Sequence, residues 1–546
     1  MQKVKSVTNE SQNGFLLRRG GIALCVMLGA TLALNAGTGL PATDLTKPDR
    51  ILLDGKPAGA AVTVGADGSV VLKTDGAAAF VRLEWDVPLA ADVRVLGDMW
   101  ERTYGDSGWR RVDDRKAPRD GTMPWYFLAS KDGRTDGYGV KVQPNAFACW
   151  TVSEKGIVLS LDVRAGLAPV RPRNRRIELC TLVSRTGKPG ESAFAAGREF
   201  CKAMCPSPRL PKEQVYGYND WYCAYGKNTA TNFLADAAFV VSLLDRGEKV
   251  ANRPFAVVDD GWQLKPEFKD AIGPEGQWGA NNPRWGMAMD EFAAKVKALG
   301  ARPGLWYRPF YPDAGRKALP VDPTDPVWER RIRQDLARFR AWGFELVKID
   351  FITWDWGQAW GFGLGDSPCS KKGLAWKDDS RTGAEVVKGL YRAMREAAGD
   401  MYVIGCNALD HFAAGLFELQ RTGDDTDGRG WPRTRKMGPN TVAMRAIHNR
   451  TFYLGDGDCV GLARAGAVPW EKNRQWLDLV AKSGTSLFVS WKRELAVDSE
   501  VADGLSRALK TASRERGTGE PLDWMETVRP ARWAFDGFGE TTYNWD

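Results

Sequence analysis

Residues 346–356, LVKIDFITWDW, carry the pattern on which the fold prediction is built: a short apolar strand that ends in a carboxylate. Apolar side chains dominate the run, as in the interior strand of a sheet, yet Lys348 and Asp350 interrupt it. Two residues apart in a strand, these side chains share one face. A structural ion pair would explain the two charges, and so would a functional site. The rest of the chain decides between these two explanations.

Short apolar strands of the same kind recur from Val215 onward and alternate with amphipathic helical stretches. Strands are expected at 215–221, 254–262, 302–307, 345–351, 401–406, 416–425 and 486–491, and helices between them, for example at 232–247, 290–300 and 326–343. Repeated βα units predict a parallel sheet with helices outside. About 300 residues of this pattern suit a closed (β/α)8 TIM-type barrel. A doubly wound open sheet is the alternative, although no Gly-rich phosphate loop follows a strand.

The remaining chain divides at the proline-rich linker CPSPRLPKEQ, residues 205–214. Residues 45–205 alternate apolar and polar side chains between Gly-Asp turns, which predicts an N-terminal β-sandwich. The barrel is expected at 206–505 and a short C-terminal β extension at 506–546. The expected fold is therefore α/β: a sandwich, a barrel and a small β element.

Residues 1–39 are expected to be a signal peptide. Arg18 and Arg19 precede the apolar stretch 21–34, and small residues follow it. Such a stretch is shorter than a membrane-spanning helix needs. We therefore expect export to the periplasm, cell surface or medium, with no membrane span after signal removal. A retained anchor is the alternative.

Composition excludes several classes of function. The chain has 546 residues, 43% apolar and 26% charged, as in a soluble globular protein. Net charge is +8, but no dense basic run with interleaved aromatics is present, so no nucleic-acid partner is expected. Only two histidines occur, and nine cysteines lack metal-ligand spacing, so neither a metal nor another cofactor is expected. The 23 tryptophans suit sugar stacking, although a Trp-rich core explains them equally well.

Carboxylates gather where the predicted strands end. Asp259 and Asp260 follow one strand and Asp350 another, and later ends carry Asp424, Asp425, Asp456 and Asp458. In a barrel this rim is the active-site face. A solvated loop acid or a helix N-cap explains any one of them. Four clusters in register with strand ends favour an active site.

Paired carboxylates at such a rim suit glycoside hydrolysis by double displacement. One ionised carboxylate attacks, while a second carboxyl group donates a proton and later takes one back. Lys348 beside Asp350 would favour the charged form of Asp350. Asp424 and Asp425 supply the second group. On a strand, neighbours face opposite ways, so at most one of them would be catalytic.

The chain resembles glycoside hydrolase family 36 and its relatives in the α-galactosidase clan over most of residues 95–490. The segments LGDMWERTYGDSGW (96–109) and MPWYFLAS (123–130) carry the resemblance in the sandwich. In the barrel it rests on YGYNDW, VVDDGWQ, GLWYRPF, VKIDF, VIGCN, RTGDDTD, GDGDC and SGTSLFVS, which follow one another in the family's order. The RTGDDTD segment (421–427) is most similar to the raffinose-synthase-like branch.

The resemblance implies the catalytic pair. Asp350 would be the nucleophile, and Asp424 the acid/base, because it follows Gly423 as the family's acid follows Ser. Asp425 is the rival, since other clan members place the acid four residues after the Arg, here Arg421.

The resemblance also implies which residues would bind a galactose-type sugar. Asp259 and Asp260 would hydrogen-bond the 4- and 6-hydroxyls, and Lys348 would hydrogen-bond the 3- and 4-hydroxyls. The other members of the predicted binding site are Arg421 and Asp458 near the 2-position, Asp425 beside the acid, the apolar walls Trp262 and Trp306, and the fifth-strand Cys406.

Departures from the family pattern bear on specificity. Gly423 replaces Ser, Cys459 stands where the clan often has Met, and NALDHF (407–412) replaces a Gly-rich run that helps to recognise the 2-substituent. Galactose and N-acetylgalactosamine therefore both stay open. The insertion 354–381, rich in Gly and Trp, suits a lid or a further sugar subsite, with a surface loop as the alternative.

We therefore expect a secreted retaining exo-α-glycosidase that releases terminal α-linked galactose or N-acetylgalactosamine from a glycan. One alternative is an α-galactosyl transferase of the raffinose-synthase type, although export favours hydrolysis. The other is a non-catalytic glycan-binding protein, which would not need both Asp350 and Asp424. The sequence leaves the oligomeric state open.

Overall fold

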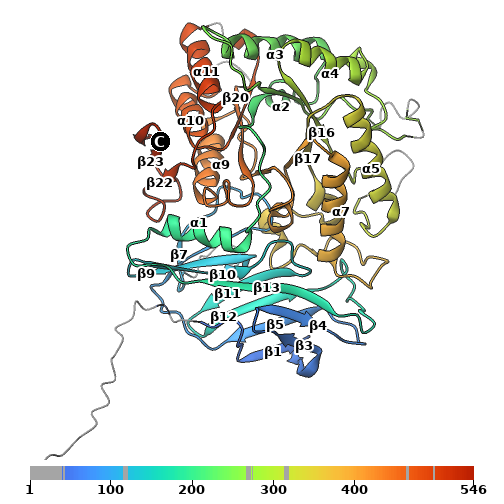
Figure 1. Ribbon diagram of the computed structural model, residues 1–546, viewed down its shortest axis with the longest axis vertical. Helices are drawn as coiled ribbons and strands as arrows, with labels where there is room; N and C mark the ends of the chain where they lie inside the picture. The colour runs from blue at the N-terminus through green and yellow to red at the C-terminus, as the bar shows by residue number, and fades with distance from the viewer. Residues whose placement is uncertain are drawn as a thin grey trace, which may run out of the picture. The chain divides into compact units, whose positions relative to one another are not determined.

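The computed structural model describes residues 40, 43–114, 121–265, 272–273, 275–312, 319–462, 467–495 and 498–546. Two antiparallel sheets precede a closed parallel barrel, and a three-stranded sheet follows it (Figure 1). This confirms the predicted fold class. The expected signal peptide, 1–39, lies outside the described residues. Within the described ranges, none of the helices combines the length and apolarity needed to cross a bilayer.

The two N-terminal sheets pack through apolar side chains that alternate along each strand. In β5 (Phe80–Trp85), Val81, Leu83 and Trp85 are buried while the residues between them are not. The first sheet has the order β2 (Lys56–Pro57), β1 (Arg50–Leu53), β5, β12 (Gly156–Asp162), β11 (Phe147–Ser153), β8 (Met123–Pro124). The second has the order β3 (Val62–Val64), β4 (Ser69–Leu72), β13 (Ile177–Arg185), β10 (Arg134–Val140), β9 (Tyr126–Lys131), β6 (Arg94–Gly97), β7 (Arg110–Arg111).

The barrel strands follow one another in chain order, and the barrel closes because the last strand pairs with the first. The strands are β14 (Tyr216–Asn219), β15 (Phe255–Val258), β16 (Arg302–Tyr307), β17 (Leu346–Ile349), β18 (Tyr402–Gly405), β19 (Leu419–Arg421), β20 (Leu454–Leu462) and β21 (Ser486–Trp491). Strands such as β15 and β17 are buried along their whole length, because helices cover one face and the barrel interior covers the other. The closed ring excludes the doubly wound alternative.

Helices lie outside the barrel (Figure 1). They are α3 (Ala230–Leu244), α4 (Met289–Ala298), α5 (Pro326–Ala341), α7 (Gly383–Ala398), α9 (Trp431–Met444), α10 (Trp470–Lys482) and α11 (Ser499–Ala512), with α1 (Ala193–Met204) before the barrel and the short α2 (Trp221–Ala224), α6 (Ile352–Gly357) and α8 (Asp410–Ala413) in its loops. The C-terminal sheet comprises β22 (Glu520–Pro521), β23 (Arg532–Phe535) and β24 (Gly539–Thr542).

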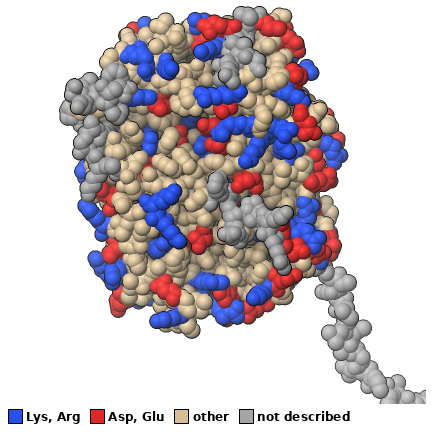
Figure 2. All heavy atoms as spheres, turned by 180° about the vertical axis from the view of Figure 1, so that it is seen from behind, with Lys and Arg blue, Asp and Glu red and all other residues tan. Residues whose placement is uncertain are grey.

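Charged side chains of both signs are interspersed over the face shown in Figure 2. Exposed ion pairs occur in the described part of the chain, such as Arg333 with Glu329 at 2.9 Å. Exposed pairs of this kind contribute little to stability, because water screens them.

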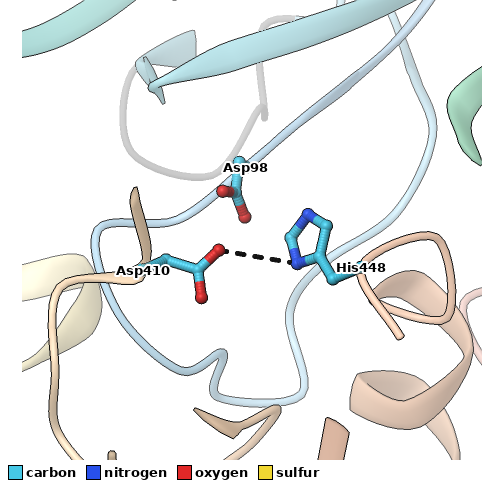
Figure 3. A group of neighbouring side chains, drawn as sticks. All are labelled: Asp98, Asp410 and His448. Atoms are coloured by element: carbon cyan, nitrogen blue, oxygen red, sulfur yellow. Dashed lines mark ion pairs between the residues drawn. The ribbon is translucent and has the colours of Figure 1, made fainter. Parts of the chain in front are cut away.

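A buried ionic cluster joins the sandwich to the barrel. Asp98 follows β6, Asp410 begins α8, and His448 follows α9; their side chains face one another (Figure 3). The guanidinium group of Arg445 bonds Asp98 at 2.8 Å and Asp410 at 3.2 Å. His448 also contacts the hydroxyl of Tyr126 on β9.

The chemistry of this cluster is that of an internal ion pair. Burial raises the pKa of both Asp98 and Asp410 and lowers the pKa of His448. Asp98, Asp410 and His448 lie close enough together to hold a metal ion. Arg445 already bonds both carboxyl groups, however, so the cluster is explained as a structural joint.

We expect Arg445→Met to lower the free energy of unfolding by about 3–5 kcal/mol, because it leaves buried carboxylates without their cation. Urea denaturation of the two proteins measures the difference. The control Arg333→Met removes an exposed arginine and should cost less than about 1 kcal/mol. Equal losses in the two variants would contradict the assignment of the cluster as a joint.

Candidate active site

A cavity of ≈ 340 Å³ lies at the carboxyl ends of the barrel strands. Its size falls within the range of small-ligand pockets. Nine of the eleven predicted site residues line it: Asp259, Asp260, Trp306, Lys348, Asp350, Cys406, Arg421, Asp424 and Asp425. Residues far apart in the sequence therefore meet here, as expected for loops at one end of a barrel. Trp262 and Asp458 do not line the cavity.

Asp350 directly follows β17 and is held by N–H donors on both oxygens. The indole N–H of Trp306 donates to Oδ2 at 3.1 Å, and the backbone N–H of Phe351 donates to Oδ1 at 2.8 Å. The side-chain amide of Asn407, in its hydrogen-bonded orientation, also donates to Oδ1. These bonds fix the direction of the carboxylate, which is what a nucleophile needs.

Lys348 does not pair with Asp350, contrary to the simplest interpretation of the opening motif. Its ammonium group bonds Oδ2 of Asp259 at 2.7 Å, and both side chains are buried. Asn219 donates to the same oxygen at 2.8 Å. Lys348 and Asp259 come from different strand ends and meet inside the barrel, so strand spacing alone does not predict the pair.

Asp220 supports this pair from behind. Its carboxylate accepts the backbone N–H of Asp259 at 2.7 Å. Burial, together with the nearby charge of Asp259, raises the pKa of Asp220 to about 7. Asp220 lies in the motif YGYNDW, although no feature of the sequence predicts this supporting role. The carboxylate of Asp260 instead accepts a hydrogen bond from the side-chain amide of Gln263 at 2.6 Å.

Asp424 and Asp425 lie beyond the end of β19, and both side chains line the cavity. The expectation that only one of them faces inward applied to a strand and is corrected here, because the chain has left the strand at this point. A Cβ at Gly423 would approach the side chain of Thr441 to 2.3 Å. Thr441 thus occupies the space of the Ser that the family pattern has here.

The two carboxylates have different cationic partners. Arg102 bonds Asp424 at 3.0 Å and Asp425 at 3.4 Å. Asp424 also meets Arg433 at 2.7 Å, whereas Asp425 meets Arg421 at 3.4 Å. Burial tends to raise the pKa of Asp425, but the guanidinium groups of Arg102 and Arg421 outweigh burial, and its pKa is lowered.

Arg102 comes from the sandwich segment 96–109, and no pattern in the sequence distinguishes it from other loop arginines. The adjacent backbone joins the barrel: Thr103 N–H donates to the carbonyl of Thr422 at 3.0 Å, and Asp424 N–H donates to that of Thr103 at 2.9 Å. The Nε–H of Arg102 donates to the side-chain oxygen of Asn407 at 3.0 Å. One arginine thereby links Asp424 to the amide that holds Asp350.

Arg421 and Cys406 form the floor of this part of the cavity. Both are about 1% exposed, and Arg421 donates to the sulfur of Cys406 at 3.4 Å. Asp458, predicted near the sugar, instead pairs with Arg421 at 3.1 Å and accepts the N–H of Thr426 at 2.9 Å. Asp458 therefore orients Arg421 from outside the cavity.

Trp306 is a wall of the cavity, as predicted, but Trp262 is not. The Trp262 indole is fully buried and donates its N–H to the carbonyl of Trp306 at 2.9 Å. Its ring packs against Trp278 and Phe339. Trp262 supports the wall from behind, because its own ring is already enclosed by other aromatic side chains.

The remaining lining residues were not singled out in advance: Arg102, Tyr104, Trp221, Phe351, Trp360 and Asn407. The segment 96–109, which contains Arg102 and Tyr104, was noted only as part of the resemblance. Trp221 lies in the quoted motif YGYNDW, and Trp360 lies in the insertion 354–381. These positions depend on how loops fold back over the barrel rim.

The arrangement suits a neutral polyhydroxylated ligand. Each cavity carboxylate already has a cationic or N–H partner, so hydroxyl groups can exchange with these bonds without leaving a charge unpaired. Aromatic side chains supply apolar walls. The site combines a firmly held carboxylate, Asp350, with two further carboxyl groups, which is the inventory for nucleophilic and acid/base catalysis.

The fold is shared with solved α-galactosidase structures. An α-galactosidase from Thermus thermophilus in complex with p-nitrophenyl α-D-galactopyranoside matches with 16% identity over 90% of this chain and 96% of that chain, at a TM-score of 0.57. A family 36 (GH36) α-galactosidase from Geobacillus stearothermophilus in complex with 1-deoxygalactonojirimycin matches with 12% identity over 86% and 68%, at 0.56. No protein-family model and no curated protein matches the chain. At these identities the likeness establishes the fold.

We expect Arg102→Met to lower the melting temperature more at pH 7 than at pH 3. The depressed pKa of Asp425 stabilises the folded state above the unfolded value of about 3.9, and this stabilisation is lost as the pH falls through the folded pKa. The Arg102→Met substitution removes part of this stabilisation, because Arg102 is one of the cations that lower the pKa of Asp425. Thermal unfolding across this pH range measures the effect.

The matched variant Arg102→Lys keeps the positive charge and should show a smaller loss at pH 7. A loss for Arg102→Met that is the same at both pH values would mean that packing, rather than charge, is what Arg102 supplies.

Proposed function

We propose that this protein is a retaining exo-α-glycosidase of the family 36 type, which releases terminal α-linked galactose or N-acetylgalactosamine from glycans. The observation that carries the proposal is the convergence of Asp350, the pair Asp424 and Asp425, and the Asp259–Lys348 pair on one cavity of small-ligand size. The shared fold of solved α-galactosidases supports it.

Asp350 is the proposed nucleophile. Its carboxylate oxygen attacks the anomeric carbon, the bond to the leaving oxygen breaks, and a β-linked glycosyl-enzyme forms. Water then attacks the same carbon, the bond to Asp350 breaks, and the sugar leaves with its α configuration restored. The N–H donors of Trp306, Phe351 and Asn407 hold the carboxylate in place through both steps.

Asp424 is the proposed acid/base. It gives a proton to the leaving oxygen in the first step and takes one from water in the second. The choice follows the resemblance, in which the acid follows Ser as Asp424 follows Gly423, and Asp425 is the rival because each carboxylate has two guanidinium partners. Arg102 and Arg421 hold Asp425 as a carboxylate, suited to binding or to orienting its neighbour.

Asp259, Asp260 and Lys348 are the proposed partners of the sugar hydroxyls. Asp259 is pinned by Lys348, Asn219 and the backbone bond to Asp220, so its acceptor positions are preorganised. A site that is built to bond a particular hydroxyl rejects analogues that leave its polar groups unpaired. This arrangement supports selection of an axial 4-hydroxyl.

We further propose that the protein is exported. The support is the sequence alone: Arg18 and Arg19 before the apolar stretch 21–34. Amino-terminal sequencing of the mature protein from the producing cell tests it, since removal of a leader near residue 39 is the expected result and an intact amino terminus contradicts it.

A panel of nitrophenyl glycosides tests the proposed function. We expect turnover of the α-galactoside or its N-acetyl counterpart, with kcat/KM for the α-glucoside lower by up to about 10⁴. Asp350→Asn should lower kcat at least about 10³-fold while substrate still binds. NMR of early product should show the α anomer. Comparable gluco and galacto rates, or an initial β anomer, would refute the proposal, and transfer products in place of free sugar would indicate a transferase.

Azide rescue distinguishes Asp424 from Asp425. Asp424→Ala should lose most activity on substrates with poor leaving groups and less on activated aryl glycosides, whose leaving group departs unprotonated. Added azide should then accelerate the second step and yield an α-glycosyl azide, because Asp350 is intact. Asp425→Ala should slow both substrate types alike. Rescue of Asp425→Ala alone would exchange the two roles.

A further inference from the structure

Phe351, the residue after the proposed nucleophile, has a backbone conformation that is rare for its residue type. Its φ is +62° and its ψ is +12°, in the left-handed region that residues with a Cβ seldom adopt. Strain of this kind persists only where surrounding contacts impose it, and it concentrates at functional sites. In this conformation the N–H of Phe351 donates to Oδ1 of Asp350 at 2.8 Å. The strained residue therefore supplies one of the donors that hold the nucleophile.

The conformation of Phe351 has no local cause in the sequence. Phenylalanine has neither the missing Cβ of glycine nor the short polar side chain of Asn and Asp, which are the features that favour positive φ. Contacts from other segments hold it instead. The ring of Phe351 meets Trp306 and Trp360 edge to face, with centroids 6.4 Å and 5.4 Å apart. The guanidinium group of Arg308 lies over the same ring, 4.2 Å from its centre, at a distance where a cation is attracted to an aromatic face.

Arg308 is itself fixed by two further contacts. Its guanidinium group also lies over the ring of Tyr311, 4.4 Å from the centre. Its Nε–H bonds the two carboxylate oxygens of Asp355 at 3.1 Å and 3.0 Å. The Asp355 side chain is completely buried, so losing the arginine would leave a buried charge without its partner. The pair therefore keeps Arg308 in one place.

Asp355 leads back to Phe351 through the backbone of α6. The N–H of Asp355 donates to the carbonyl of Phe351 at 3.0 Å. The contacts thus form a closed circuit, in which the carbonyl of Phe351 bonds Asp355, the carboxylate of Asp355 binds Arg308, and Arg308 covers the ring of Phe351. Rotation of Phe351 to negative φ would break at least one of these contacts.

We infer that Arg308 is a positioning residue: through the ring of Phe351, it keeps the N–H of Phe351 directed at Asp350. Phe351 lines the catalytic cavity and Arg308 does not, so the effect of Arg308 on a substrate passes through Phe351. The expected effect on turnover rests on the proposed glycosidase function. The expected effect on the backbone of Phe351 does not.

Two substitutions of Phe351 separate its backbone from its ring. Phe351→Ala and Phe351→Gly both remove the ring, but glycine adopts positive φ without a steric penalty and alanine does not. We expect kcat for p-nitrophenyl α-galactoside to fall at least about tenfold in Phe351→Ala, because the nucleophile loses its direction. Phe351→Gly should keep at least about three times the kcat of Phe351→Ala. Equal losses would mean that the ring acts only as a wall of the cavity, and would overturn the inference.

A double-mutant cycle tests whether Arg308 acts through Phe351. Arg308→Met should lower kcat at least about tenfold and change KM less than about threefold, since no substrate contact is removed. In the Phe351→Gly background the same substitution should lower kcat less than about threefold, because glycine needs no ring contact to keep its conformation. Losses of equal size in the two backgrounds would contradict the coupling.

Arg302→Met is the matched control. Arg302 begins β16, whereas Arg308 follows the end of that strand. It lies over the ring of Phe255 at the same distance of 4.2 Å and pairs with Glu345 at 2.7 Å, so it shares the contacts of Arg308 but not the position. Arg302→Met should leave kcat within about twofold of the unmodified protein. A loss as large as that of Arg308→Met would overturn the inference.

Hydrogen exchange tests the inference independently of activity. In protein made with isotope-labelled phenylalanine, the amide resonance that Phe351→Ala lacks belongs to Phe351. This amide should exchange at least about tenfold faster in Arg308→Met, and within about twofold of the unmodified rate in Arg302→Met. Asp355→Asn removes the charge that fixes Arg308, so it should act in the same direction and serves if Arg308→Met does not fold.

The exchange rates also separate this inference from the proposed function. If the unmodified protein turns over no α-galactoside, the glycosidase proposal fails, while faster exchange of the Phe351 amide in Arg308→Met still supports the positioning role. Unchanged exchange of this amide in the folded Arg308 or Asp355 variant overturns the positioning role whatever the activity.

Discussion

The guanidinium group of Arg102 lies within bonding distance of both Asp424 and Asp425, and it reaches them from the sandwich rather than from the barrel. Two neighbouring carboxylates in a partly enclosed cavity repel each other and need a cation close by. Arg433 and Arg421, from the barrel, bond one carboxylate each, whereas Arg102 bonds both, so the sandwich contributes a cation that the two carboxylates share. The backbone bridge between Thr103 and Gly423 holds the two segments at this distance.

The joint between sandwich and barrel explains why the Arg102 loop keeps its position. Arg445 holds Asp98, four residues before Arg102, and Asp410, three residues after Asn407. The same buried cluster thus anchors both chain segments that reach the catalytic cavity from this side. Burying such charges is expensive unless each is paired, so the arrangement tolerates little displacement. Because the buried cluster is rigid, it holds the carboxylates of the catalytic cavity in precise positions.

The insertion after β17, residues 354–381, also contacts the sandwich. It begins at Trp354, shortly after Asp350, pairs with the sandwich at Gly166 and Ala375, and contains Trp360, which lines two cavities. The N–H of Gly361 donates to Glu101 at 2.9 Å, and the ring of Tyr104 packs on Gly361, where a Cβ would approach it to 2.1 Å. The loop that carries Arg102 therefore also packs against the insertion.

The resemblance supplied Trp306, Cys406 and Arg421, whereas periodicity and strand-end carboxylates were enough to predict the barrel, the sandwich and the carboxylates of the cavity, because strand ends in a barrel must meet on one rim. Asp350, Asp424 and Asp259 were found in this way. The partner of Lys348, the inward direction of both Asp424 and Asp425, and the buried positions of Trp262 and Asp458 were not. Each depends on contacts between segments distant in sequence, which local patterns do not encode. Arg102 is the clearest case: an ordinary arginine in a loop of the sandwich becomes part of the site only when the tertiary fold brings that loop onto the barrel rim.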